Sequence, residues 1–134
     1  MLHHIEINVS NLQQSREFYS VLLPELGYAE YQNWPLGFSY RSGAAYLVFV
    51  QTEEPFRDIP YHRKMTGLNH LAFRADSRAE VDRLTLTMKE KGIPILYEDR
   101  HPFAGGPDHY AVFMEDPDRL KIEITAVKGE EALG

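Results

Sequence analysis

The stretch HHIEINVSNLQQSREFY at residues 3–19 decides the fold, because it changes from a strand pattern to a helix pattern within a few positions. Polar and apolar residues alternate strictly from position 4 to position 9, which predicts a strand with one polar face. Ser10 and Gln13 have the spacing of a capping box, so we expect a helix that starts at Ser10 or Asn11 and ends before Gly27. Three strands should follow, at 28–33, 37–41 and 44–50, because these segments are rich in Tyr, Phe and Val.

The same order of patterns returns in GLNHLAFRADSRAEVDRL at residues 67–84. A strand is predicted over 68–75, a capping box at Ser77 and Glu80, a helix that ends at Gly92, and strands near 94–98, 109–115 and 119–126. His70 follows His4 by 66 positions and Gly92 follows Gly27 by 65, which indicates a duplicated unit. The sequence therefore predicts an α+β fold of two βαβββ modules.

We expect one domain over residues 1–134, as the length suggests. Its parts are a first module (1–50), a linker (51–66) that contains Pro55 and Pro60, and a second module (67–126) followed by a short charged tail.

Bulk properties exclude several classes of protein. The net charge of −6 disfavours nucleic acid as a partner, because phosphates would be repelled. No apolar run approaches the length of a transmembrane helix, so we expect no membrane partner. The chain has no cysteine and its first strand begins at residue 3 or 4, so we expect neither disulfides nor a signal peptide. These properties predict a cytoplasmic protein.

Three residues on the polar sides of predicted strands are candidate metal ligands: His4, His70 and Glu123. His4 and His70 occupy equivalent positions in the two modules, and Glu123 lies between Ile122 and Ile124. A carboxylate in a central strand is costly to bury unless it is paired or binds a cation. Two imidazoles and a carboxylate suit Zn, Fe, Mn, Ni or Co and leave coordination positions open. The alternative is three ordinary residues on a half-exposed sheet.

Three stretches resemble the vicinal oxygen chelate superfamily: residues 3–19, residues 67–84, and HYAVFMEDPDRLKIEI at 109–124. This group includes glyoxalase I, bleomycin-resistance proteins, fosfomycin-resistance enzymes, methylmalonyl-CoA epimerase and extradiol dioxygenases. The resemblance implies two βαβββ modules that form a curved eight-stranded cleft around one divalent metal ion. It places the first-strand histidines of the modules at His4 and His70, and the last-strand glutamate at Glu123.

The resemblance to glyoxalase I is incomplete at the fourth ligand. Aligning Tyr46–Phe49 with Lys121–Ile124 puts Val48 at that position, and valine cannot bind a metal. The remaining two-His, one-Glu set is more similar to those of the fosfomycin-resistance transferases and extradiol dioxygenases.

Further polar residues are candidates for catalysis or for binding the substrate. Glu6 shares the predicted side of His4 and is a candidate general base, and Asn8 is a candidate substrate contact; both could instead solvate a strand end. The loop RHPFAGGPDH at 100–109 is a candidate lid that would bring His109 or Tyr110 to the site as an acid or base.

Two cations and one aromatic residue complete the candidates. Arg74 and Lys121 would neutralise an anionic substrate, or else form ordinary salt bridges. Tyr46 would line the wall of the cleft, or else pack in the core or at a dimer contact.

Two classes of function remain open from the sequence. The leading hypothesis is a metal-dependent enzyme of lyase, isomerase, transferase or dioxygenase type that acts on a small oxygen-bearing molecule. The alternative is a protein that binds and sequesters a small molecule without catalysis, as the resemblance to bleomycin-resistance proteins implies. The resemblance also implies a homodimer.

Overall fold

The computed structural model describes residues 1–127, so the predicted tail after Ala126 falls almost entirely outside the described residues. The chain divides into two compact units, Met1–Tyr61 and His62–Gly134. The boundary falls inside the segment 51–66 that the sequence predicts to be a linker.

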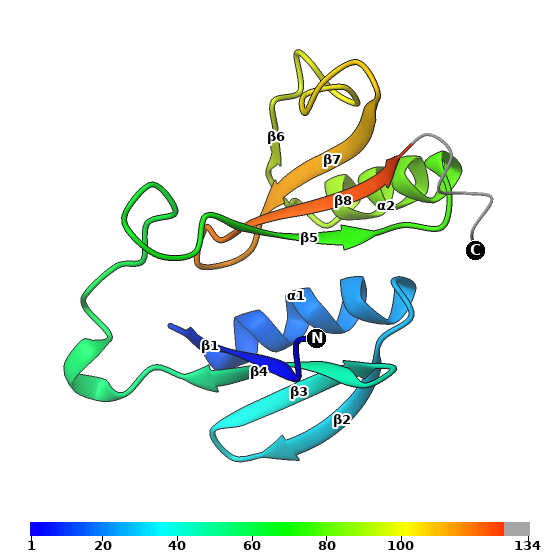
Figure 1. Cartoon of the computed structure of the whole chain (residues 1–134). Coiled ribbons are helices and arrows are strands. Elements are labelled where there is room, and N and C mark those ends of the chain that lie inside the picture. Colours follow the sequence, from blue (N-terminus) through cyan, green and yellow to red (C-terminus); the bar gives the residue numbers. More distant parts are fainter. Residues whose placement is uncertain (128–134) are drawn as a thin grey trace. The chain divides into compact units, whose positions relative to one another are not determined.

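Unit 1 is one βαβββ module (Figure 1). Its elements are β1 (His4–Val9), α1 (Leu12–Glu25), β2 (Ala29–Trp34), β3 (Gly37–Ser42) and β4 (Ala45–Gln51). The strands form a sheet in the order β1-β4-β3-β2, with β1 parallel to β4 and the other neighbours antiparallel. Helix α1 packs against β2, β3 and β4. A short 3-10 helix, η1 (Glu54–Phe56), follows β4.

Unit 2 repeats this order (Figure 1). Its elements are β5 (His70–Arg74), α2 (Arg78–Glu90), β6 (Ile95–Leu96), β7 (His109–Glu115) and β8 (Lys121–Val127). The sheet order is β5-β8-β7-β6, with β5 parallel to β8. Helix α2 packs against β7 and β8. The predicted α+β fold of two βαβββ modules is therefore confirmed.

The strand registers show how closely the two modules correspond. His4 pairs with Tyr46 in unit 1, as His70 pairs with Lys121 in unit 2. Two residues further along, Val48 pairs with Glu6, whereas Glu123 pairs with Ala72. The alignment of Tyr46–Phe49 with Lys121–Ile124 made from the sequence is therefore confirmed, and Val48 occupies the position of Glu123.

Alternation along the strands separates a helix side from an opposite side in each sheet. On the helix side of unit 2, Ile122 and Ile124 of β8 are fully buried, as are Leu84 and Met88 of α2, which packs against β8. The odd-numbered residues of β8 lie on the opposite side, as the two-residue period of a strand requires. Glu123 is one of them, and so this opposite side of the sheet is the side that carries the candidate site.

The N-cap of α1 is the second of the two predicted positions, Ser10 and Asn11. The N-cap is Asn11, whose side chain accepts a hydrogen bond from the Gln14 N–H, so the predicted Ser10–Gln13 capping box is wrong. The carbonyl of Ser10 instead accepts from the side chain of Gln51, and the Gln51 side-chain oxygen accepts from the Leu12 N–H. Asparagine is as good an N-cap as serine. The contacts of the Gln51 side chain with Ser10 and Leu12 therefore decide at which residue the helix begins.

The start of α2 agrees with the prediction more closely. The Ser77 hydroxyl accepts from the Glu80 N–H, while the Glu80 carboxylate accepts from the N–H of Asp76. Neither helix of the described residues is long and apolar enough to cross a membrane.

The strand predicted at 94–98 is much shorter in the structure. Pairing with β7 covers only Ile95 and Leu96, because Tyr97 adopts the left-handed backbone conformation with φ of 56°. The Tyr97 carbonyl then accepts from the N–H groups of Arg100 and His101, which turns the chain away from the sheet. Few residues other than glycine adopt this conformation, and the sequence gives no signal for it at Tyr97.

Candidate functional site

The structure brings together three of the predicted site residues around one carboxylate in unit 2. Glu123 is 6% exposed, and each of its oxygens contacts a different histidine. The His70 Nε2 lies 3.1 Å from Oε1, and the His109 Nε2 makes a short contact with Oε2. Both histidine side chains keep a third of their surface exposed. The buried carboxylate is therefore compensated by two imidazoles that solvent can reach.

Asn69 determines which nitrogen of His70 carries a hydrogen. The Asn69 Oδ1 lies 2.7 Å from the His70 Nδ1, and an amide oxygen can only accept a hydrogen bond, so Nδ1 must donate. The Nε2 of a neutral ring is then a bare acceptor that faces the Oε1 of Glu123. Two acceptors at this distance need a proton on one of them or a cation beside them.

A tight turn before β8 holds Glu123 in place. The carboxylate of Asp116 accepts hydrogen bonds of 2.8 Å from the N–H groups of both Asp118 and Leu120. Asp116 is buried, and its own N–H donates to the Leu120 carbonyl. This turn joins β7 to β8 in the register that sets Glu123 opposite Phe113. The EDPD sequence at 115–118 thus acts by fixing where β8 begins.

His109 is held by the loop that precedes β7. The Ala111 N–H donates to the Pro102 carbonyl, and the Gly105 backbone lies against the His109 ring. A Cβ built at Gly105 would lie 2.5 Å from the His109 Cδ2, which is too close for any side chain. A side chain at residue 105 would therefore force the His109 ring or the loop backbone to shift.

A second group of side chains lies beside this cluster on the same side of the sheet. The Phe113 ring lies 6.4 Å from the His70 ring and 5.5 Å from the Tyr97 ring, measured between centroids. The ammonium group of Lys121 lies over both Tyr97 and Phe113 and donates to the Tyr97 hydroxyl over 3.3 Å. The prediction from the sequence included Lys121 but missed Tyr97, Phe113, Asn69 and Gly105.

Four predicted residues lie in unit 1. His4 is exposed at the start of β1, and its ring stacks on Tyr46 at 4.9 Å with an interplanar angle of 8°. The His4 Nδ1 also lies 2.9 Å from the His3 Nδ1. Glu6 and Asn8 are exposed further along β1. The roles assigned to His4, Glu6, Asn8 and Tyr46 stay predictions.

Two further predicted residues belong to unit 2. Arg74 is exposed at the end of β5. Tyr110 faces α2, where its hydroxyl donates to Asp82 and Arg78 lies over its ring. The Asp82 hydrogen bond is the main cause that raises the pKa of Tyr110 to about 12, with burial and the Asp82 charge adding to it. The catalytic role of Tyr110 stays a prediction, which this position on the helix side does not favour.

The donor types of the cluster fit a divalent metal ion. Imidazole nitrogen and carboxylate oxygen suit the ions from manganese to zinc, and a metal-binding histidine commonly donates its other N–H to an oxygen, as His70 can to Asn69. Across residues 1–127, no group of three or more His, Cys, Asp or Glu side chains is arranged so that it could hold a metal ion. In the structure, the Nε2 of each of the two histidines is instead directed to one oxygen of Glu123.

The comparison with known families identifies the superfamily of the chain. Residues 1–124 match the model of the Glyoxalase/Bleomycin resistance protein/Dioxygenase superfamily. The chain belongs to this superfamily. The resemblance read from the sequence is therefore confirmed.

Similar proteins in this glyoxalase superfamily include bacterial relatives. The uncharacterized protein YqjT of Bacillus subtilis (strain 168) is 55% identical over 93% of this chain and 98% of its own length. The crystal structure of a candidate glyoxalase from Bacillus halodurans has a TM-score of 0.93 and 64% identity, with 94% of this chain and 95% of that chain covered. A glyoxalase/bleomycin resistance protein from Albidiferax ferrireducens T118 has a TM-score of 0.71 and 25% identity, with coverage of 93% and 97%.

Proposed function

We propose that this protein is a divalent-metal-dependent enzyme that acts on a small oxygen-bearing substrate. The contact between His70 and Glu123 carries the proposal. The Nδ1 of His70 faces the amide oxygen of Asn69 and its Nε2 faces a buried carboxylate, an arrangement that a divalent cation between the two acceptors would stabilise in place of a proton. The superfamily includes enzymes with this kind of chemistry, and that membership adds support.

His70 and Glu123 would hold the ion, together with ligands from outside this pair. A bound divalent ion supplies Lewis-acid stabilisation of negative charge that develops on a substrate oxygen. His4 as a third ligand is a proposal that rests on the sequence alone. The proposal that the ion is Zn, Fe, Mn, Ni or Co also rests on the sequence.

His109 would act as the general acid and base that transfers a proton of the substrate. Its ring is one-third exposed, so a bound substrate can reach it, and its Nε2 is held against Glu123. An imidazole in this position can take a proton from one substrate atom and return it to another. Glu6, the other candidate base, belongs to unit 1.

A turnover screen on reloaded protein tests the proposal. Protein stripped with a chelator and reloaded with one divalent ion at a time is incubated with small oxygen-bearing compounds, and the products are followed by mass spectrometry. We expect conversion with at least one ion, none in the stripped protein, and a loss of about 100-fold or more in His109→Gln, as general acid–base catalysis contributes 10²–10⁴-fold.

The sequestering function gives a different result in the same screen. A compound that stays bound and is recovered unchanged with every ion, and equally in stripped protein, would establish a binding protein and contradict the enzyme. Lys91→Met, at an exposed position after α2, is the matched control for handling and folding.

A further inference from the structure

Within residues 1–127, Lys121 lies beside the His70–Glu123 pair and forms no ion pair with a carboxylate. Lys121 is directly paired with His70 in the parallel ladder between β5 and β8, and both lie on the same side of the sheet as Glu123. The natural partner of Lys121 is Glu115, which lies opposite it in β7. The contacts of Glu115 therefore decide whether the ammonium group of Lys121 is neutralised.

Glu115 is already occupied by two arginines. Its Oε2 lies 3.3 Å from a terminal nitrogen of Arg63 and accepts a 3.0 Å hydrogen bond from the Arg119 Nε. The Arg63 guanidinium also donates to the Arg119 carbonyl, which fixes it there. Among the described residues, no carboxylate forms an ion pair with Lys121, so its charge is directed elsewhere.

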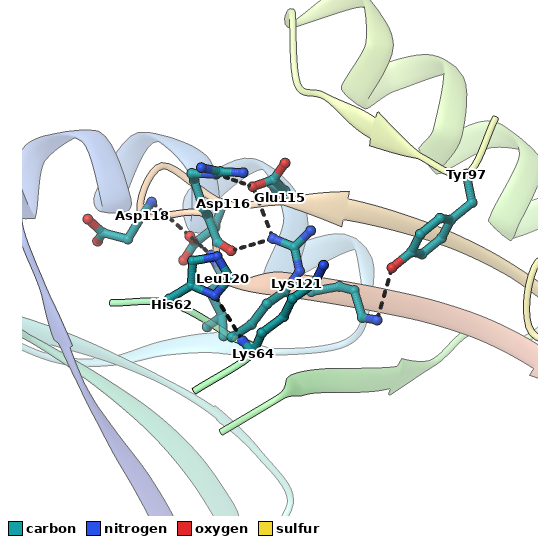
Figure 2. A network of polar contacts seen from close by, with 10 residues as sticks. His62, Lys64, Tyr97, Glu115, Asp116, Asp118, Leu120 and Lys121 are labelled. Atoms are coloured by element: carbon teal, nitrogen blue, oxygen red, sulfur yellow. Dashed lines mark hydrogen bonds and ion pairs between the residues drawn. The ribbon is translucent and has the colours of Figure 1, made fainter. Parts of the chain in front are cut away.

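The ammonium group of Lys121 is directed to Tyr97 instead (Figure 2). It donates to the Tyr97 hydroxyl oxygen over 3.3 Å and lies 5.4 Å and 5.5 Å from the ring centroids of Tyr97 and Phe113. Because the hydroxyl oxygen accepts from Lys121, the hydroxyl hydrogen of Tyr97 remains able to donate. Lys121 keeps two further N–H groups for other acceptors.

The backbone supports this placement of Tyr97. Its φ of 56° is unfavourable for a residue with a side chain, and such conformations persist where the surrounding structure enforces them. Here the carbonyl of Tyr97 accepts from Arg100 and His101, and the ring packs edge-on against Phe113. The hydroxyl is thus held at Lys121 by rigid elements.

We infer that Lys121 and Tyr97 form an oxyanion-binding subsite for the substrate, a deepening that rests on the proposed function. One ammonium group and one hydroxyl donor, both partly buried and next to aromatic rings, suit a carboxylate or a phosphate-type group. Neighbouring strands lie about 4.8 Å apart, so one small molecule can reach both Lys121 and His70. The substrate class is a small molecule with an oxyanion at one end and a protic or chelating oxygen at the other, lying over Phe113.

Anion titrations followed by NMR test this inference. Full-length protein labelled with ¹⁵N is titrated with methylphosphonate and, separately, with propionate, in the presence of a chelator so that neither anion can bind through a metal ion. We expect at least one anion to shift the backbone signals of Tyr97, Phe113 and Lys121 saturably. The anion that binds more tightly distinguishes a phosphate-type group from a carboxylate.

Variants separate the subsite from general charge effects. Lys121→Met should weaken binding about tenfold or more and Tyr97→Phe about threefold, as expected for hydrogen bonds to a charged group. Lys91→Met removes the same charge from an exposed position after α2 and should leave the affinity unchanged. The spectra themselves report that each variant is folded.

Two results would overturn the inference: no saturable shift with either anion, or equal weakening by Lys91→Met and Lys121→Met. Metal content, measured on the same wild-type preparation before the chelator is added, separates this outcome from the fate of the proposed function. Bound metal without anion binding contradicts the subsite alone. Anion binding without metal supports the subsite while the metal-dependent enzyme fails.

Discussion

The two modules differ at one position that decides where the proposed chemistry takes place. Val48 and Glu123 occupy equivalent places in β4 and β8, and both are buried. Valine at this place needs no partner, whereas a buried carboxylate costs several kcal/mol unless it is paired. In unit 2 the partners are His70 and His109, and the chemistry of the proposed site follows from them.

Gly105 controls the contact between His109 and Glu123. In Gly105→Ala, the new Cβ would lie 2.5 Å from the His109 ring, which must then rotate away from the carboxylate. We expect a loss of about 10-fold or more in metal affinity or activity, the usual effect of removing an orienting partner. Metal titration and NMR of the histidine ring signals measure the change.

A double-mutant cycle shows whether the effect of Gly105 passes through His109. In a His109→Ala background the clash is absent, so adding Gly105→Ala should cause no further loss. An equal loss in both backgrounds would mean that Gly105 acts on the loop backbone and not on the ring.

At the scale of elements, the turn at Asp116 sets the register of β8. Asp116→Ala leaves the N–H groups of Asp118 and Leu120 without their acceptor, so the free energy of unfolding should fall by about 1–3 kcal/mol. Urea denaturation measures it. Asp99→Ala, in an exposed loop, is the control and should stay within about 0.5 kcal/mol of the wild type. A wild-type stability for Asp116→Ala would show that the turn does not depend on its carboxylate.

The hydrogen bond between Tyr110 of β7 and Asp82 of α2 makes the stability of the protein depend on pH. The hydrogen bond to Asp82 raises the pKa of Tyr110 to about 12, so the folded protein favours the protonated phenol. This contribution to stability is present below pH 10, the usual pKa of tyrosine, and is lost as the pH rises from 10 to 12. Absorbance of phenolate at 295 nm should show a late titration phase, to which Tyr28 and Tyr40 also contribute because burial raises the pKa of each; Tyr110→Phe should reduce it by one tyrosine and Asp82→Ala should move that part to lower pH. A phase unchanged in both variants would contradict the assignment.

The elements could be predicted from the sequence where one local pattern determines them. Strict alternation identified β1 and β5, and the Ser77–Glu80 spacing identified the start of α2. The choice between Ser10 and Asn11 as the N-cap of α1 could not be made from the sequence, and neither could the length of β6, because the first depends on a contact distant in the sequence and the second on an unusual backbone conformation. The Gln51 side chain decides the first, and the left-handed φ of Tyr97 decides the second.

At the scale of the whole molecule, the duplication made part of the site predictable. His70 and Glu123 stood out because they occupy matched positions on polar strand faces, and His109 because it ends a glycine-rich loop. Asn69, Tyr97 and Gly105 carry no such signal, since each acts through a neighbour that only the folded chain brings close. The eight-stranded cleft and the homodimer stay predictions from the resemblance.

Removing the metal should destabilise the whole protein. A ligand present at 100 times its dissociation constant stabilises the native state by about 2.7 kcal/mol, so a chelator should lower the Tm by roughly 5 to 10 °C. Scanning calorimetry with and without chelator measures the shift. Glu123→Gln is the control and should show almost no difference between the two conditions. A wild-type Tm that the chelator leaves unchanged would count against a tightly bound ion.

The most direct measurement is the metal content of tag-free protein by mass spectrometry, beside His70→Ala, Glu123→Ala and His4→Ala. The account predicts close to one divalent ion per chain in the wild type and loss of the ion in both His70→Ala and Glu123→Ala. The result for His4→Ala decides whether His4 is a third ligand. Wild-type protein that takes up no ion after incubation with excess Zn, Fe, Mn, Ni or Co would contradict the central claim.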